Sequence, residues 1–257
     1  MSGEWLKDWK KVAVAAGALA AGGAVVYYLL KEDQHPLVPV EKDASNLPKT
    51  PTVEEFKKED VQQILEQIIK SQEQMKVHMK ALTKELLAKQ MNFQQTYQRV
   101  LEVQPKDPLE EYGLSMLQFD QVLDKFQSDP GVREAIAKIM GAPDPSNATS
   151  EKVQSITVKK IIEVHTFMQE ELSKLVDHVQ SMPGRDSLDM KTVTIAAQAI
   201  VGSKMEQKFS ITSEDIESAV LLYHTMLATD QTFAQLNMQI QTTMSKLMGS
   251  PLAPGGM

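Results

Sequence analysis

Hydrophobic residues follow three different patterns along this chain. They form an uncharged run from Val12 to Leu30, then a region of alternating four- and three-residue spacing from Val61 to Val100, and then several shorter amphipathic segments. Apolar residues three or four positions apart predict helices, whereas strict alternation predicts strands. We find no convincing strand pattern. The expected fold is therefore all-α, with a single N-terminal transmembrane helix, a long coiled-coil-like helix and a helical bundle of about five helices.

The first run has the length of a membrane span. A helix rises 1.5 Å per residue, so residues 12–30 reach roughly 28 Å, close to the ~30 Å hydrocarbon core of a bilayer. Trp5 and Trp9 precede the run, and Tyr27 and Tyr28 close it. Aromatic residues at both ends are typical of the membrane–water interface. We therefore predict a short N-terminal tail, residues 1–11, followed by a transmembrane helix over 12–30.

Two other interpretations of this run remain open. Ala18-Leu19-Ala20 resembles the small-residue cleavage site of a signal peptide. Glu4 and Asp8 in the preceding segment, and the continuation of the run well beyond Ala20, argue against cleavage. A buried helix of a soluble domain is the other alternative, which the flanking aromatic residues disfavour.

Small residues recur every fourth position within the predicted span. Such faces let helix backbones approach closely inside a membrane. We therefore expect this helix to pack against other transmembrane helices, through Ala13, Gly17 and Ala21 on one row and Ala18 and Gly22 on another.

The charges beside the span indicate an orientation. Three Lys precede it, and the residues just after it are net acidic. Lysine-rich flanks stay on the cytoplasmic or matrix side. For the mitochondrial inner membrane, which we favour, this places the N-terminus in the matrix and the body in the intermembrane space. In an endoplasmic reticulum protein the body would be lumenal.

A proline-rich linker, residues 31–53, follows the span. Pro36, Pro39, Pro48 and Pro51 lie among polar residues without an apolar period. Proline stiffens such segments into extended spacers. We therefore expect the linker to hold the body away from the bilayer.

A heptad pattern then predicts a long helix over 54–104. Apolar residues at alternating four- and three-residue steps are typical of a coiled-coil seam. The alternative is one long bundle helix that uses the same face against its own neighbours. The predicted partner face consists of Val61, Leu65, Ile68, Met75, Met79, Leu82, Leu86 and Phe93.

Shorter helical patterns predict the bundle over residues 109–248, and a Pro- and Gly-rich tail, 249–257, follows it. Asp129-Pro130 and Thr212 with Asp215 are typical helix starts. The expected helices are Leu114–Gln127, Pro130 to Gly141, Ile156–Met182, Ser187 to Met205, and Thr212 to Met248.

Composition narrows the chemistry. The chain has no Cys, which excludes disulfides and thiolate metal sites. Its net charge of −7 disfavours nucleic acid, because phosphate contacts need clustered Lys and Arg. The five His residues lack the spacing of a helical metal site, and neighbouring Glu pairs diverge on a helix. We therefore expect no enzyme activity, no cofactor, no metal and no nucleic-acid partner.

One segment carries a family resemblance. Residues 128–143, Ser-Asp-Pro-Gly-Val-Arg-Glu-Ala-Ile-Ala-Lys-Ile-Met-Gly-Ala-Pro, resemble the short Asp-Pro-started helices of the STI1-type co-chaperone repeat. The resemblance covers sixteen of 257 residues. It implies binding of client helices by Val132, Ile136 and Met140.

These patterns lead to two functional hypotheses. The first is a non-catalytic, single-pass accessory subunit of a larger membrane complex of the respiratory-chain or ATP synthase type. Its partners would be the lipid bilayer and other membrane-protein subunits, reached through the transmembrane helix and the long helix. The alternative is a membrane-tethered co-chaperone, import receptor or tether that binds apolar helices in a Met-rich groove.

Overall fold

The computed structural model describes residues 53–139 and 150–248. This part of the chain contains eleven α-helices and two short 3₁₀ helices, and no strand, so the all-α prediction is confirmed for it. None of its helices is both long enough and apolar enough to cross a membrane. The predicted transmembrane helix and its small-residue face lie outside the described residues, as do most of the linker and the tail, and they stay predictions.

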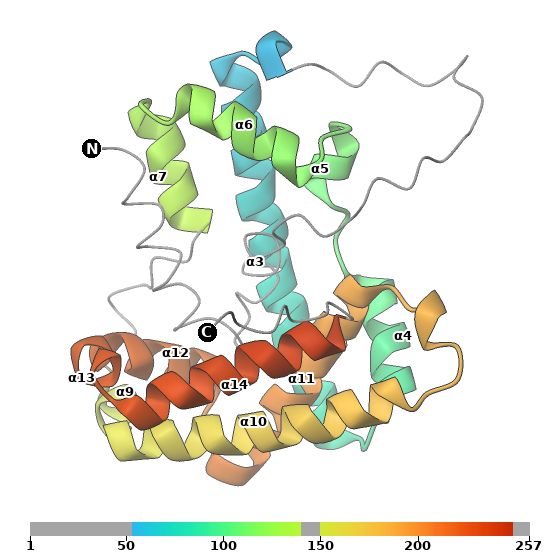
Figure 1. Ribbon diagram of the computed structural model, residues 1–257, viewed down its shortest axis with the longest axis vertical. Coiled ribbons are helices and arrows are strands. Elements are labelled where there is room, and N and C mark those ends of the chain that lie inside the picture. Colours follow the sequence, from blue (N-terminus) through green and yellow to red (C-terminus); the bar gives the residue numbers. More distant parts are fainter. Residues whose placement is uncertain (1–52, 140–149, 249–257) are drawn as a thin grey trace, which may run out of the picture. The chain divides into compact units, whose positions relative to one another are not determined.

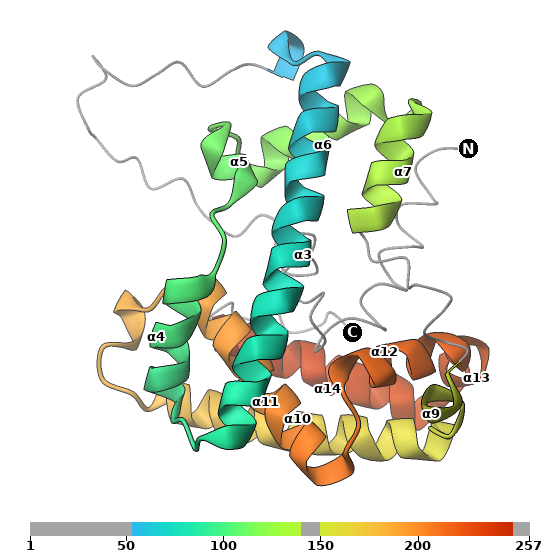
Figure 2. The same cartoon turned by 180° about the vertical axis from the view of Figure 1, so that it is seen from behind.

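The described helices fall into two compact units (Figures 1 and 2). The larger unit contains residues 76–104 and 150–248, and the smaller contains 53–75 and 105–139. Helix α3 (Lys58–Ala88) contributes residues to both. This grouping differs from the expected division into a long helix over 54–104 and a separate bundle over 109–248. The difference arises because the apolar face of α3 packs against other helices of this same chain.

The smaller unit has its own hydrophobic core. Besides the start of α3, it contains η1 (Val53–Glu55), α5 (Pro108–Glu111), α6 (Met116–Phe126) and α7 (Pro130–Ile139). The buried core residues are Phe56, Val61, Ile64, Leu65, Leu109, Leu114, Phe119, Val122 and Val132. Burial of these side chains is the main favourable contribution to the stability of this unit.

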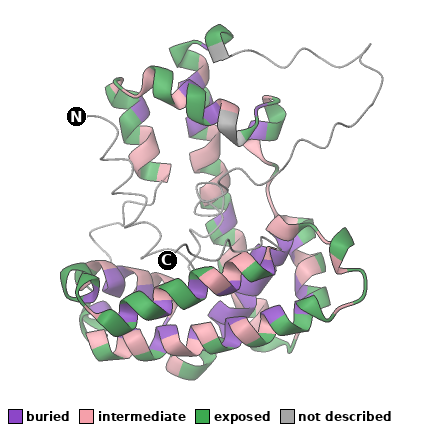
Figure 3. Ribbon diagram, in the orientation of Figure 1, coloured by how far each residue is buried: buried purple, intermediate pink, exposed green. Residues whose placement is uncertain are grey.

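Helix α11 (Met190–Phe209) is the centre of the larger unit. All residues from Thr192 to Ser203 are buried, as the purple ribbon of α11 in Figure 3 shows. This segment contains no charged residue, which suits a helix that is covered all round. The helices of this unit are the end of α3, α4 (Phe93–Val103), α9 (Glu151–Gln154), α10 (Val158–Gln180), α11, α12 (Ser213–Leu222), α13 (His224–Ala228) and α14 (Gln231–Leu247), with η2 (Arg185–Ser187) before α11.

The predicted long helix is interrupted. Helix α3 ends at Ala88, and α4 begins at Phe93. The Asn92 side chain accepts a hydrogen bond from the backbone N–H of Gln95 at 2.9 Å, and the Gln95 side chain accepts one from Asn92 N–H at 3.0 Å. This reciprocal capping box fixes a new helix start and overrides the heptad period.

The predicted last helix is also interrupted. The capping box of Thr212 and Asp215 is confirmed, but α12 ends at Leu222 and two further helices follow. The Asp230 carboxylate accepts a hydrogen bond from Phe233 N–H at 2.9 Å and starts α14. Helix α11 likewise starts later than expected, because Asp189 rather than Ser187 provides its N-cap.

Candidate interaction surface

In the smaller unit, the heptad residues pack inside the chain. Val61 and Leu65 are buried in its core, with at most 1% exposure. Ile68 is partly buried against the same core. These three side chains contact helices of their own chain, as the bundle-helix alternative expects. A role for them in contact with a separate partner stays a prediction.

In the larger unit, the remaining heptad residues show the same tendency. The buried ones are Leu82 and Phe93, and Met79 and Leu86 are partly buried. Met75, the last residue of α3 that belongs to the smaller unit, is also buried. The two large apolar side chains that α3 exposes lie elsewhere on the helix: Val77 is 65% exposed and Leu87 is 39% exposed.

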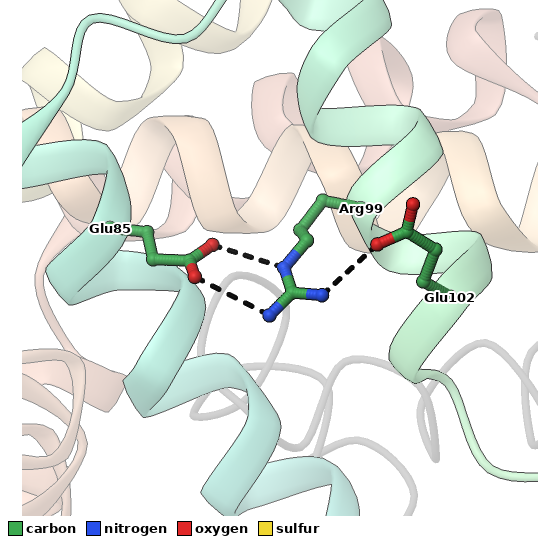
Figure 4. Close-up of polar contacts among 3 residues, drawn as sticks. All are labelled: Glu85, Arg99 and Glu102. Atoms are coloured by element: carbon green, nitrogen blue, oxygen red, sulfur yellow. Dashed lines mark hydrogen bonds and ion pairs between the residues drawn. The ribbon is translucent and has the colours of Figure 1, made fainter.

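A charged cluster joins α3 to α4 across the interruption (Figure 4). The Arg99 guanidinium donates hydrogen bonds to both carboxylate oxygens of Glu85, at 3.1 and 3.4 Å, and to Glu102 at 3.0 Å. Hydrogen bonds to Glu85, and then to Glu102, raise the pKa of Arg99 above its usual value. The geometry is that of a structural clamp, since every group is paired within the helical hairpin.

A second charged cluster lies between α10 and α11. The buried carboxylate of Glu171 accepts hydrogen bonds from Lys174 and from Lys204, both at 2.6 Å. Burial acts to raise the pKa of Glu171, but the two lysine ammonium groups outweigh it and the pKa is lowered. The carboxylate is therefore held ionised as a structural tie and does not resemble a general acid.

His165 is a buried residue of α10. Its Nδ1 lies 2.8 Å from the carbonyl oxygen of Ile161, and its ring meets the Phe233 ring edge-on at 5.1 Å between centroids. Burial lowers the pKa of His165. Among the described residues no group of three His, Asp or Glu side chains is placed to hold a metal ion. His165 therefore serves as a core residue.

The segment that resembles a co-chaperone repeat forms α7. As expected, Asp129 caps this helix: its carboxylate accepts hydrogen bonds from Gly131 and Val132 N–H at 2.9 and 3.1 Å. Val132 has no exposed surface and belongs to the core of the smaller unit, and Ile136 is packed against that core. Met140 lies outside the described residues. The resemblance implies client contact by Val132, and this implication is not met, because the chain itself covers that side chain.

Helix α14 has an unusual solvent-facing side. It buries Phe233, Leu236 and Ile240, whereas Met238 is 68% exposed and is the most exposed large hydrophobic residue in the described part of the chain. At 100° per residue, Met238 lies opposite the centre of the buried side. We call this surface the α14 outer face; it consists of Gln231, Ala234, Gln235, Met238, Gln241, Thr242 and Ser245.

The α14 outer face carries no charge. No Asp, Glu, Lys or Arg lies between Asp230 and Lys246, whereas every other described helix of ten or more residues contains at least two charged residues. Interface cores are depleted of charged residues and enriched in Met, because uncharged groups cost less to desolvate. Met226 on α13 is also well exposed, at 59%, but the charged residue Asp230 separates it from this face along the chain. The outer face shares two features with interface cores, the absence of charge and an exposed Met side chain.

The sequence contained a signal for this face that apolar periodicity does not detect. Periodicity located the buried side of α14 and left the opposite side as ordinary solvent-facing surface. The missed signal is fifteen consecutive uncharged residues, 231–245, in a chain of which 24% of residues are charged. Met75, Met168 and Met205, by contrast, are buried core residues.

Comparison with known proteins gives no relative. No protein-family model, no curated protein and no solved structure matches this chain.

Proposed function

We propose that this chain is a non-catalytic, single-pass subunit of a larger membrane protein complex, most consistent with the mitochondrial inner membrane. The observation that carries the proposal is the α14 outer face, which carries no charge and exposes Met238. The second support is the uncharged stretch Val12–Leu30 with its small-residue rows. Together they give the chain one contact surface in the bilayer and one on the helical body.

We also propose an orientation in the membrane. The lysine-bearing N-terminus faces the matrix, and the helical body lies in the intermembrane space. The weakly hydrophobic, Ala- and Gly-rich span suits a protein that is imported after synthesis. The co-chaperone alternative is less well supported, because the core of the smaller unit covers Val132 and the buried Met residues fill cores.

Co-purification of the tagged full chain tests this function. Membranes are solubilised in mild detergent, separated by native electrophoresis and quantified by mass spectrometry. A subunit comigrates with one large complex at a constant molar ratio to its partners. A free monomer, or a broad set of partners at variable ratios, would contradict the proposal; the second result would favour the co-chaperone alternative.

Two substitutions in the predicted span sharpen this test. Gly17→Ile adds a bulky side chain to the small-residue row and is expected to reduce the share of chain in the complex. Gly23→Ile adds the same side chain at a position outside both small-residue rows and is the matched control. If both variants are found in the complex in equal amounts, the small-residue rows no longer support the proposed function.

A further inference from the structure

We infer that the α14 outer face binds a second copy of this chain, through antiparallel pairing of two α14 helices about a two-fold axis at Met238. The inference rests on the proposed function in so far as both treat this face as a protein contact. It adds the identity of the partner and the register of the contact.

Charge identifies a second copy as a suitable occupant. A two-fold interface brings identical surfaces together, so a charged face meets its own charges. Each chain is acidic, with a net charge of −7, and two copies repel each other in general. The α14 outer face lacks charge and is free of this repulsion. Its Gln, Thr and Ser side chains both donate and accept hydrogen bonds, so they can pair with copies of themselves.

The arrangement of residues along α14 is symmetric about Met238. Asp230 and Lys246, the charged residues at the two ends, both lie eight positions from it. Antiparallel pairing brings the acidic end of one helix to the level of the basic end of the other, and opposes the two helix dipoles. Parallel pairing would place Asp beside Asp and Lys beside Lys. The charges therefore favour the antiparallel arrangement.

The outer face also has the spacing of a helix-pairing seam. Gln231, Gln235, Met238, Thr242 and Ser245 follow one another at steps of four, three, four and three. This spacing keeps a stripe of residues facing a neighbouring helix. In the antiparallel register Met238 meets its symmetry mate, and the residues at equal distances on either side, Gln231 with Ser245 and Ala234 with Thr242, lie at the same level. Every one of these pairs is uncharged.

Site-specific cross-linking tests the contact, and the absence of native Cys makes each introduced thiol unique. Full-length Met238→Cys chain is oxidised in native membranes with oxygen and a copper catalyst, and dimer is scored without reductant. We expect a disulfide-linked dimer, because the two Met238 positions adjoin at the axis. Met226→Cys is the matched control, since Met226 is also a well exposed Met, and we expect it to stay monomeric.

The register has its own test. In the antiparallel dimer, the two copies of position 231 lie about 21 Å apart along the helix axes, beyond the reach of a disulfide. Gln231→Cys alone and Ser245→Cys alone are therefore expected not to cross-link, whereas co-expression of the two variants gives a cross-linked dimer. Efficient cross-linking of either single variant would overturn the antiparallel register.

A charge variant separates this inference from the proposed function. Met238→Glu places two carboxylates at the axis and is expected to abolish the dimer, while helicity is unchanged because the side chain is exposed. Persistence of the dimer in this variant, or equal cross-linking of Met238→Cys and Met226→Cys, would overturn the inference. If Met238→Cys gives no dimer, and Met238→Glu no longer co-purifies with other subunits of the complex, then self-association is wrong and the proposed function stands. If the full chain comigrates with no partner at all, the proposed function fails independently.

Discussion

The carboxylate of Glu171 on α10 accepts a hydrogen bond from the ammonium group of Lys204 on α11, with 2.6 Å between the two atoms. The Glu171 side chain is 10% exposed, whereas that of Lys204 is 48% exposed. This pair ties the central helix of the larger unit to its longest neighbour. Because the carboxylate is buried, losing an ammonium partner leaves charge that water solvates poorly.

Lys204→Met is therefore expected to destabilise the larger unit. We expect the free energy of unfolding to fall by about 1 kcal/mol, as for a half-exposed ion pair. Lys174→Met is the matched control, since Lys174 is more exposed and lies on the same helix as Glu171. Urea unfolding of the two variants should show a smaller loss of stability for Lys174→Met. An equal or larger loss for Lys174→Met would contradict the role given to the Glu171–Lys204 ion pair.

The same pair predicts a pH dependence. The pKa of Glu171 is lowered in the folded chain, so its stabilising contribution is present above the usual carboxyl pKa of about 4.3 and is lost as pH falls through the lowered folded value. The stability difference between the native chain and Lys204→Met should therefore shrink in acid. A difference that stays constant from neutral pH to pH 3 would argue against an ionised Glu171.

His165 predicts a second pH effect with a different window. Burial lowers its pKa, so the unfolded chain takes up a proton first as pH falls below about 6.5. Stability should fall in this window, by up to about 1.4 kcal/mol for each pH unit. His165→Leu should remove this loss, whereas His224→Gln, at an exposed position, should retain it. Thermal unfolding between pH 7 and pH 5 measures both.

The N-cap residue Asn92 is expected to stabilise the start of α4. Asn92→Ala deletes the side chain that accepts the Gln95 N–H, and we expect it to cost about 1 kcal/mol. Asn92→Ser retains a capping oxygen and should recover most of the loss. Chemical denaturation of the three chains checks this. Equal stability of Asn92→Ala and the native chain would mean that the interruption between α3 and α4 does not depend on the cap.

The close packing of α11 gives a further prediction. Ala197 is fully buried, so Ala197→Leu forces a larger side chain among packed helices and should cost about 1–3 kcal/mol. Ala81→Leu, at an exposed position of α3, provides the control for the change in residue type. A stable, fully helical Ala197→Leu variant would show that α11 is not tightly enclosed.

The sequence predicted the helical class and most buried faces, because apolar spacing reports which side of a helix is covered. It did not predict the interruptions near Asn92 and Asp230, where short-range capping hydrogen bonds compete with a longer apolar period. It also left open whether Val61 and Leu65 face a partner or their own chain, since both arrangements need the same spacing. The α14 outer face was missed because its signal is the absence of charge on a solvent-facing side.

Carbonate extraction combined with protease protection tests whether the chain is anchored in the membrane with its body in the intermembrane space. Mitochondrial membranes carrying the full chain are washed in alkaline carbonate, and protease protection is then followed with tags at both ends, before and after rupture of the outer membrane. We expect the chain to stay in the carbonate pellet, the body to become protease-sensitive once the outer membrane is opened, and the N-terminal tag to stay protected. Release of the chain into the carbonate supernatant would contradict this prediction.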